Sequence, residues 1–287
     1  MIIDMHIHPY CREVSLVPGI DEGLQRQFES PYRPASKEKI ARRRQLFTQG
    51  SIKDILILMD ESRIDRAVIV AFDLTSQYGV VMVTNRDVSR LAAAHPDRLI
   101  PFASVDPSLG RPAVDELVHA VQELGCKGVK LCPPVQKFDF SDPKFQPLWE
   151  KALELDIIVW THASHQMGHP GSDARLGSPM LVEPVALRYP GLKLVLGHCG
   201  FPWVWEAWSL ALRHANVYVD ISAYPTLYNH FPWDAYAKSG LEHKVLFATD
   251  YPLYSWQQTL AALEAVDITE EFKKKILGEN ARTLLGL

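Results

Sequence analysis

Short runs of apolar and β-branched residues recur along the chain and predict a series of buried strands. Most are continuous apolar stretches rather than strict alternations of apolar and polar residues. That pattern is typical of strands buried on both faces of a parallel sheet. The eight runs are residues 2–7, 67–71, 99–105, 128–132, 157–161, 193–198, 216–220 and 245–249.

The segments between these runs have the periodicity of amphipathic helices. In residues 112–124 apolar side chains recur at positions i, i+3, i+4 and i+7, which form one face of a helix. Residues 143–155 repeat the pattern after Asp142, a residue type that favours helix N-termini. The other predicted helices are residues 84–95, 178–189, 202–213 and 255–265, and residues 269–287 predict a closing pair of helices on the outside of the fold.

Eight strands alternating with helices predict an α/β protein built as a closed (β/α)₈ barrel of the TIM type. Successive strands begin about 30 residues apart, the length of one strand–helix–strand unit, except for a longer first interval. We therefore expect one barrel domain over residues 1–287, with an insertion at about 9–50 after the first strand. An open doubly wound sheet is the alternative. It would normally carry a glycine-rich turn after its first strand, where this chain has His-Pro-Tyr.

The insertion at about 9–50 contains four prolines and the arginine run 42–44. One interpretation is a lid over the barrel mouth or a dimer contact. The other is a solvated loop with a short helix. The sequence favours neither.

Composition narrows the classes of function. The 287 residues are 47% hydrophobic and 22% charged, which is typical of a globular chain. Lys and Arg number 30 against 34 Asp and Glu, and this net charge of −4 gives no reason to expect nucleic acid or an anionic membrane as partner. Four scattered cysteines do not predict a disulfide framework. With no apolar run near the roughly 20 residues that span a bilayer and no signal-peptide pattern, we expect a soluble cytoplasmic protein.

Histidine and aspartate residues stand at the ends of four predicted strands. His6 and His8 are two residues apart, so their side chains share one face of the first strand. The fifth strand ends at His162, the sixth at His198 and the eighth at Asp250. In a barrel these ends meet at the C-terminal rim, where catalytic residues collect. His6, His8, His162 and Asp250 would then form a set of three imidazoles and one carboxylate, which suits zinc or another borderline divalent ion in a catalytic site.

The same residues indicate acid–base chemistry. A bound ion lowers the pKa of a coordinated water to about 7, so hydroxide becomes available at neutral pH. Asp250 could accept the water proton and pass it to a leaving group. His198 could orient the water, donate to an oxyanion or serve as a fifth ligand, and these roles stay open. The centre could equally catalyse non-oxidative decarboxylation, in which a proton replaces carbon dioxide.

The motifs around these residues resemble the amidohydrolase superfamily, specifically the amidohydrolase-2 branch that includes aminocarboxymuconate semialdehyde decarboxylase and related decarboxylases. The resemblance implies a distorted (β/α)₈ barrel with one divalent ion on the four residues named above, and His198 beside the metal-bound water as a proton-transfer group. The insertion at about 9–50 matches no motif of the family. The matching pieces are D-M-H-I-H at 4–8, G-V-K-L at 128–131, W-T-H at 160–162, L-G-H-C-G at 196–200 and A-T-D-Y-P at 248–252.

Lys130, at the end of the fourth strand, is a candidate for substrate binding. We expect its ammonium group to meet a substrate carboxylate or to pack against an acidic side chain. Some superfamily members instead carry a carboxylated lysine on this strand that bridges two metal ions. The first reading predicts one ion per chain and the second predicts two.

Other residues could also contact the substrate. Trp203 follows the sixth strand and could wall an aromatic pocket together with Tyr224, whereas we expect Trp160 to point away from the barrel axis. His165 and its neighbour at 169 are interpreted as exposed loop histidines or as substrate contacts. Arg175 could clamp a carboxylate or be a solvated loop residue.

The main functional prediction is a metal-dependent hydrolase, in which metal-activated water attacks a small amide, lactone or ester. The alternative is a non-oxidative, metal-dependent decarboxylase of a small aromatic or unsaturated acid. The expected cofactor is one divalent metal ion, with Zn²⁺ as first choice and Mn²⁺ as the other candidate. The expected partner is a small-molecule substrate, without nucleic acid or membrane, and the resemblance suggests a homodimer. A barrel kept only as a binding module would be expected to lack a ligand, and all four are present.

Overall fold

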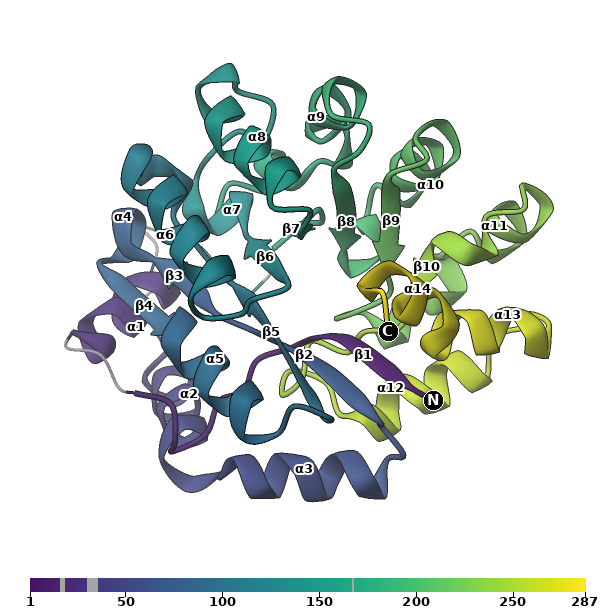
Figure 1. The fold of residues 1–287 in the computed structure, drawn as a ribbon. Helices are drawn as coiled ribbons and strands as arrows, with labels where there is room; N and C mark the ends of the chain where they lie inside the picture. Colours follow the sequence, from purple (N-terminus) through teal and green to yellow (C-terminus); the bar gives the residue numbers. More distant parts are fainter. Residues whose placement is uncertain (16–18, 30–35, 167) are drawn as a thin grey trace.

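A single parallel sheet of eight strands forms the centre of the computed structural model, which describes residues 1–15, 19–29, 36–166 and 168–287. The order of the strands in the sheet is their order in the chain. The strands surround a common centre and the helices lie outside them (Figure 1). The strands are β1 (Ile3–Ile7), β2 (Arg66–Val70), β5 (Leu99–Ala103), β6 (Gly128–Leu131), β7 (Ile158–His162), β8 (Lys193–Gly197), β9 (Val217–Asp220) and β10 (Val245–Leu246).

The sheet closes into a barrel where β1 meets β10 and the chain that follows it. The backbone N–H of Met5 donates to the carbonyl of Phe247 at 3.0 Å, and the N–H of Asp250 donates to the carbonyl of His6 at 3.0 Å. β10 has only two residues, so single hydrogen bonds rather than a long ladder complete the ring. This closure confirms the predicted (β/α)₈ barrel and excludes the open sheet.

Helices cover the outside of the barrel. α6, for example, begins at Arg111 with proline in its first turn, a position where the missing N–H costs nothing. α5 begins after Thr84, whose side chain accepts a hydrogen bond from the backbone of Asp87. The principal outer helices are α3 (Ile52–Glu61), α5 (Asn85–Ala94), α6 (Arg111–Gln122), α8 (Gln146–Glu154), α9 (Glu183–Arg188), α10 (Val204–Arg213), α11 (Trp233–Lys238) and α12 (Trp256–Glu264).

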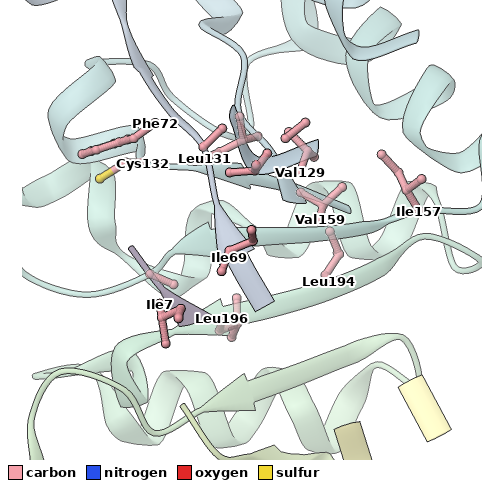
Figure 2. Packing of buried hydrophobic residues seen from close by; sticks show 14 of the residues in the cluster. Ile7, Ile69, Phe72, Val129, Leu131, Cys132, Ile157, Val159, Leu194 and Leu196 are labelled. Carbon is pink, nitrogen blue, oxygen red and sulfur yellow. The ribbon is translucent and has the colours of Figure 1, made fainter. Parts of the chain in front are cut away.

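Alternating side chains of the strands divide the core into two clusters. In β2, Val68 and Val70 belong to the cluster inside the barrel, whereas Ala67 and Ile69 belong to the cluster between strands and helices. Figure 2 shows part of this outer cluster, including Ile69 among residues from neighbouring strands. Because both faces are apolar, the strands appear in the sequence as continuous hydrophobic runs.

The structure differs from the sequence prediction at two places. After β2 the chain forms a small hairpin, β3 (Phe72–Leu74) and β4 (Val80–Val83), joined by the short helix α4 (Thr75–Tyr78). At the C-terminus, α13 (Glu270–Lys274), a π-helical segment (Lys275–Glu279) and α14 (Asn280–Leu285) follow one another without a break. Ala281 and Leu284 of α14 join the cluster inside the barrel. The last helix therefore covers one end of the barrel instead of packing on its outer wall.

The chain between β1 and β2 carries α1 (Ile20–Phe28), α2 (Lys37–Gln49) and α3. Phe47 of α2 packs on Tyr10, with ring centroids 4.7 Å apart. Residues 16–18 and 30–35 of the expected insertion lie outside the described residues. Its role as a lid or dimer contact and the single-domain organisation stay predictions. Within the described ranges we find no helix with the length and apolar character of a membrane span.

Candidate active site

A cavity of about 250 Å³ lies at the carboxyl ends of the barrel strands. Eight of the residues singled out in the sequence line it, and they lie in the barrel strands or in the segments that follow them. These are His6, His8, Lys130, His162, His169, His198, Tyr224 and Asp250. The other lining residues are Tyr10, Phe72, Met82, Gln166, Gly168, Ala223, Pro252, Leu253 and Tyr254.

His6, His8 and Asp250 form a group with the spacing of metal ligands. Their ligand atoms lie within 4.8 Å of one another. Asp250 Oδ1 is 3.3 Å from His8 Nε2 and 3.6 Å from His6 Nδ1. Both ring nitrogens of His6 are buried, and neither has a hydrogen-bond partner in the described part of the chain. Buried polar atoms normally have partners, so this donor set fits a divalent ion that would be held by these three side chains.

His162 lies beside this group, on the same cavity wall. Ser164 Oγ is 3.0 Å from His162 Nε2, which leaves Nδ1 as the nitrogen that could bind an ion. The ring of His198 lies close to His162 and to the three-residue group. Its centroid is 4.4 Å from that of His162 and 5.4 Å from that of His6. All four residues predicted as ligands and the predicted proton-transfer group line one cavity, but His162 lies outside the group whose ligand atoms are within 4.8 Å of one another. Their roles stay predictions.

Burial is the largest influence on three of these imidazoles. It lowers the pKa values of His6, His162 and His198 well below the ordinary 6.5. The positive charge of Lys130 lowers all three further, and the imidazoles act on one another in the same direction. A neutral imidazole is the form that binds a metal ion or accepts a proton.

A buried carboxylate, Asp4, joins the strand ends that carry His6 and Asp250. Its Oδ1 accepts hydrogen bonds from the backbone N–H groups of His6, at 3.0 Å, and Thr249, at 3.1 Å. Its Oδ2 accepts from the Thr249 hydroxyl at 2.6 Å and the Trp256 indole at 2.7 Å. Burial raises the pKa of Asp4 to about 7, although these donors act in the opposite direction.

A second buried carboxylate, Asp220, lies at the end of β9. Its Oδ1 accepts from the backbone N–H groups of His198 and Ser222, each at 2.9 Å, and from the Ser222 hydroxyl at 2.6 Å. Its Oδ2 accepts from the Trp160 indole. Sequence reasoning missed both carboxylates. The signal was present, because Asp4 shares a strand face with His6 and Asp220 ends a predicted strand.

Trp160 lies beneath the cavity. Its ring centroid is 4.2 Å from that of His6 and 5.1 Å from that of His198, and its side chain is fully buried. The expectation that it points away from the barrel axis was wrong. Trp160 precedes His162 by two residues, so both side chains point to the inner face.

Lys130 is buried, and its ammonium group lies 3.7 Å from the ring centroid of Phe72. The structure therefore places this lysine on the cavity wall, and its role in substrate binding stays a prediction. Tyr224 also lines the cavity, in agreement with its assignment as a wall residue. Phe72 belongs to the hairpin strand β3, which the sequence did not predict.

Three other predicted substrate contacts fall outside the described lining. Arg175 is exposed, pairs with Asp173 at 2.7 Å and is not among the lining residues. Trp203 precedes α10, and His165 is exposed, with its backbone carbonyl accepting from the Tyr224 hydroxyl. The loop after β7 instead contributes His169, for which the sequence left an exposed position or a substrate contact open, and which is buried in the cavity wall. Loop residues lack the strand parity that located the others.

Unusual backbone conformations surround the cavity at the ends of β8, β9 and β10. His198, Ala223 and Asp250 have φ values of 67°, 71° and 63°. This left-handed region is costly for residues other than glycine, and it persists where neighbouring contacts impose it. Two such contacts are the hydrogen bond that the His198 N–H donates to Asp220 and the one that the Asp250 N–H donates to the His6 carbonyl.

Comparisons with known proteins give a consistent result over most of the chain. The family model described as Amidohydrolase matches residues 3–287. Gamma-resorcylate decarboxylase from Polaromonas sp. strain JS666 is 27% identical over an alignment of 285 residues, and the match covers 80% of this chain and 86% of that protein. 2-Amino-3-carboxymuconate-6-semialdehyde decarboxylase from Dictyostelium discoideum is 25% identical over an alignment of 238 residues, and the match covers 71% of this chain and 65% of that protein.

Among solved structures, a dihydroxybenzoic acid decarboxylase from Polaromonas sp. JS666 has a similar fold. It is described with bound manganese and the inhibitor 2-nitroresorcinol. The TM-score is 0.70 at 21% identity, with 100% of this chain and 97% of that chain covered. At this identity the likeness concerns the fold.

These relatives correct the main functional prediction. We expected hydrolysis of an amide, lactone or ester, but the relatives are named as decarboxylases. The hydrolase reading is therefore wrong, and the findings favour the alternative. The physical reason is that one set of ligands can serve both chemistries, so the motifs did not distinguish them.

Proposed function

We propose, on the premise that this chain belongs to the amidohydrolase family, that it is a metal-dependent carboxy-lyase. It would remove carbon dioxide without oxidation from a small aromatic or unsaturated carboxylic acid. The observation that carries the proposal is the cavity in which a group of possible metal ligands and the buried ammonium of Lys130 share one wall. The decarboxylase relatives support this choice over hydrolysis.

His6, His8, His162 and Asp250 are the residues that would hold a divalent ion. The ring nitrogens of His6, which lack hydrogen-bond partners in the described chain, fit that role. When bound, the ion supplies Lewis acidity that polarises substrate oxygen atoms. Manganese is the first ion to test, because the Polaromonas structure is described with it. Zinc, our first choice from the sequence, suits the same nitrogen and oxygen donors.

Lys130 would attract and orient the acid. Its ammonium lies on the cavity wall among Phe72 and the histidines. At about 4 Å an ammonium and a carboxylate attract each other by about 4 kcal/mol at an effective dielectric constant of 20. The attraction disappears when the carboxylate leaves as neutral carbon dioxide, so the cation does not hold the product.

The cavity walls suit a small planar substrate. Tyr10 stacks on His8 with an interplanar angle of 6°, and Phe72 and Tyr224 form further aromatic surface. A volume of about 250 Å³ is slightly below the roughly 300–1,000 Å³ that ligand pockets commonly measure. We therefore infer a substrate with a single ring or a comparable unsaturated chain.

Decarboxylation also needs a proton. The electron pair of the broken carbon–carbon bond stays on the ring or alkene carbon, which takes up one proton as carbon dioxide departs. Asp250 and His198 are the two groups on the cavity wall that we assign to hold or relay it.

The reaction class is tested with the manganese-loaded protein and a panel of hydroxybenzoates, unsaturated acids, lactones and esters. We expect carbon dioxide release from at least one acid, with one deuterium incorporated from D₂O at the carbon that lost the carboxyl group. Ring opening of a lactone or cleavage of an ester, without carbon dioxide release from any acid, would contradict the proposal.

The metal site has a separate test. His6→Ala and Asp250→Ala should each lose bound manganese on dialysis, measured by elemental analysis. His243→Ala is the matched control, because His243 is exposed and bonds to Gly240 before β10, away from the cavity residues. Stoichiometric metal in either site variant would refute the assignment.

A further inference from the structure

The hydrogen bonds around Asp220 determine where protons lie in its neighbourhood. Three donors converge on Oδ1, namely the backbone N–H groups of His198 and Ser222 and the Ser222 hydroxyl. Oδ2 accepts from the indole of Trp160. An oxygen surrounded by N–H donors has no proton of its own to give, so the hydroxyl proton of Ser222 must point to Asp220.

This orientation has a consequence for His198. Ser222 Oγ is 2.7 Å from His198 Nδ1. The hydroxyl has only one proton, and that proton is directed to Asp220, so the oxygen can only accept from the ring. We propose that Asp220 and Ser222 hold His198 in the tautomer with its proton on Nδ1, and that Nε2 is the ring nitrogen that serves the cavity.

The arrangement holds whichever charge state His198 adopts. A neutral ring and a charged ring both carry a proton on Nδ1, so the proton that can be exchanged is the one on Nε2. Nδ1 cannot bind a metal ion while Ser222 accepts its proton. The sequence left several roles open for His198. In this tautomer each of them must be carried out by Nε2, either as a proton acceptor and donor or as a metal ligand.

Asp220 holds the backbone of His198 as well as its ring. The His198 N–H bonds directly to Oδ1, at a residue with a φ of 67°. One carboxylate thus sets both the position of the residue and the orientation of its imidazole. Beside the neighbouring strand, Ser164 contacts Nε2 of His162 instead, so the two adjacent rings use opposite nitrogens for their serine contacts.

The tautomer is a statement about the folded protein, whereas its catalytic use rests on the proposed decarboxylase function. Ser222 and Asp220 are positioning residues, which act through His198. The two parts can be tested separately.

The first experiment measures the tautomer by ¹⁵N NMR of protein with labelled histidine, loaded with diamagnetic zinc, using His198→Gln to assign the signals. We expect a protonated, pyrrole-type Nδ1 and an Nε2 without a proton or bound to metal. A proton on Nε2 with an unprotonated Nδ1 would overturn the proposal. No substrate is needed, so the result stands even if no acid is decarboxylated.

The second experiment compares Ser222→Ala with Ser89→Ala. Ser89 also donates from a hydroxyl, to the carbonyl of Leu124, but it lies on α5 and outside the cavity lining. Ser222→Ala should lower kcat about 10–100-fold, the usual cost of losing a supporting contact, with KM unchanged, and Ser89→Ala should keep the wild-type values. Wild-type kcat in Ser222→Ala would overturn the positioning role. If that variant does not fold, the NMR measurement on the unaltered protein still decides the tautomer.

Discussion

Asp4 and Asp220 lie below the cavity on β1 and β9, and they are bonded in the same way. Each buried carboxylate accepts from two backbone N–H groups, one hydroxyl and one tryptophan indole. In each set, one of the backbone groups belongs to a histidine of the cavity wall. The surroundings of the two carboxylates differ in the hydrogen bond that the neighbouring hydroxyl oxygen accepts.

Beside the first carboxylate, Thr249 Oγ1 accepts from the backbone N–H of Tyr251 at 3.1 Å. Beside the second, Ser222 Oγ accepts from the imidazole of His198 at 2.7 Å. The hydrogen bonds from Asp4 through the Thr249 hydroxyl lead only to a backbone N–H group, so they can hold the strand ends in place but cannot move a proton. Those from Asp220 through the Ser222 hydroxyl lead to a side chain that can exchange a proton. The same set of donors therefore supports a candidate metal site in one place and a candidate proton-transfer group in the other.

Removing either buried carboxylate should have the largest effect on stability. Asp4→Ala and Asp220→Ala should each lower the free energy of unfolding by about 3–5 kcal/mol, because four donors lose their acceptor and each buried unsatisfied donor costs about 1–3 kcal/mol, part of which water recovers. Urea unfolding measures this loss. Asp234→Ala, at an exposed site, should change stability by less than about 0.5 kcal/mol. A clear difference between the two buried sites would break the structural parallel.

Substituting the hydroxyl residue beside each carboxylate should have a smaller effect and should show that the two carboxylates support different functions. Thr249→Val should weaken metal binding about 10–100-fold, as loss of support around a ligand usually does, and excess manganese should restore activity. Ser222→Ala should show a lower kcat that excess manganese does not restore. Activity measured across a manganese titration distinguishes the two. If both variants recover with metal, the second carboxylate also serves the metal site and the distinction fails.

The smallest effect concerns the two indoles. Trp256→Phe and Trp160→Phe each remove one donor to a carboxylate and should each cost about 1 kcal/mol in thermal or urea unfolding. Only Trp160 lies under the cavity, against His6 and His198, so we expect KM to change in Trp160→Phe alone. A comparable change in Trp256→Phe would mean that the first carboxylate also shapes the substrate site.

Much of the barrel and the wall of the site could be predicted from the sequence. Strands buried on both faces must be apolar throughout, which makes them visible as runs, and their parity places His6, His8 and His162 on the inner face. Parallel strands end at one rim, so residues at these ends, including Asp250, had to meet. The same rule applied to residue 160 would also have placed Trp160 correctly.

The remaining features depend on contacts between distant parts of the chain. Asp4 and Thr249 are 245 residues apart, and no local pattern predicts that one accepts from the other. The loop residues Trp203, His165 and Arg175 lie outside the described lining while His169 lies in it, because loop side chains follow individual backbone angles instead of a repeating period. Sequence alone determined which chemical groups reach the rim. Only the tertiary structure decided which hydrogen bonds orient them, because those bonds depend on distances between atoms that chain order does not specify.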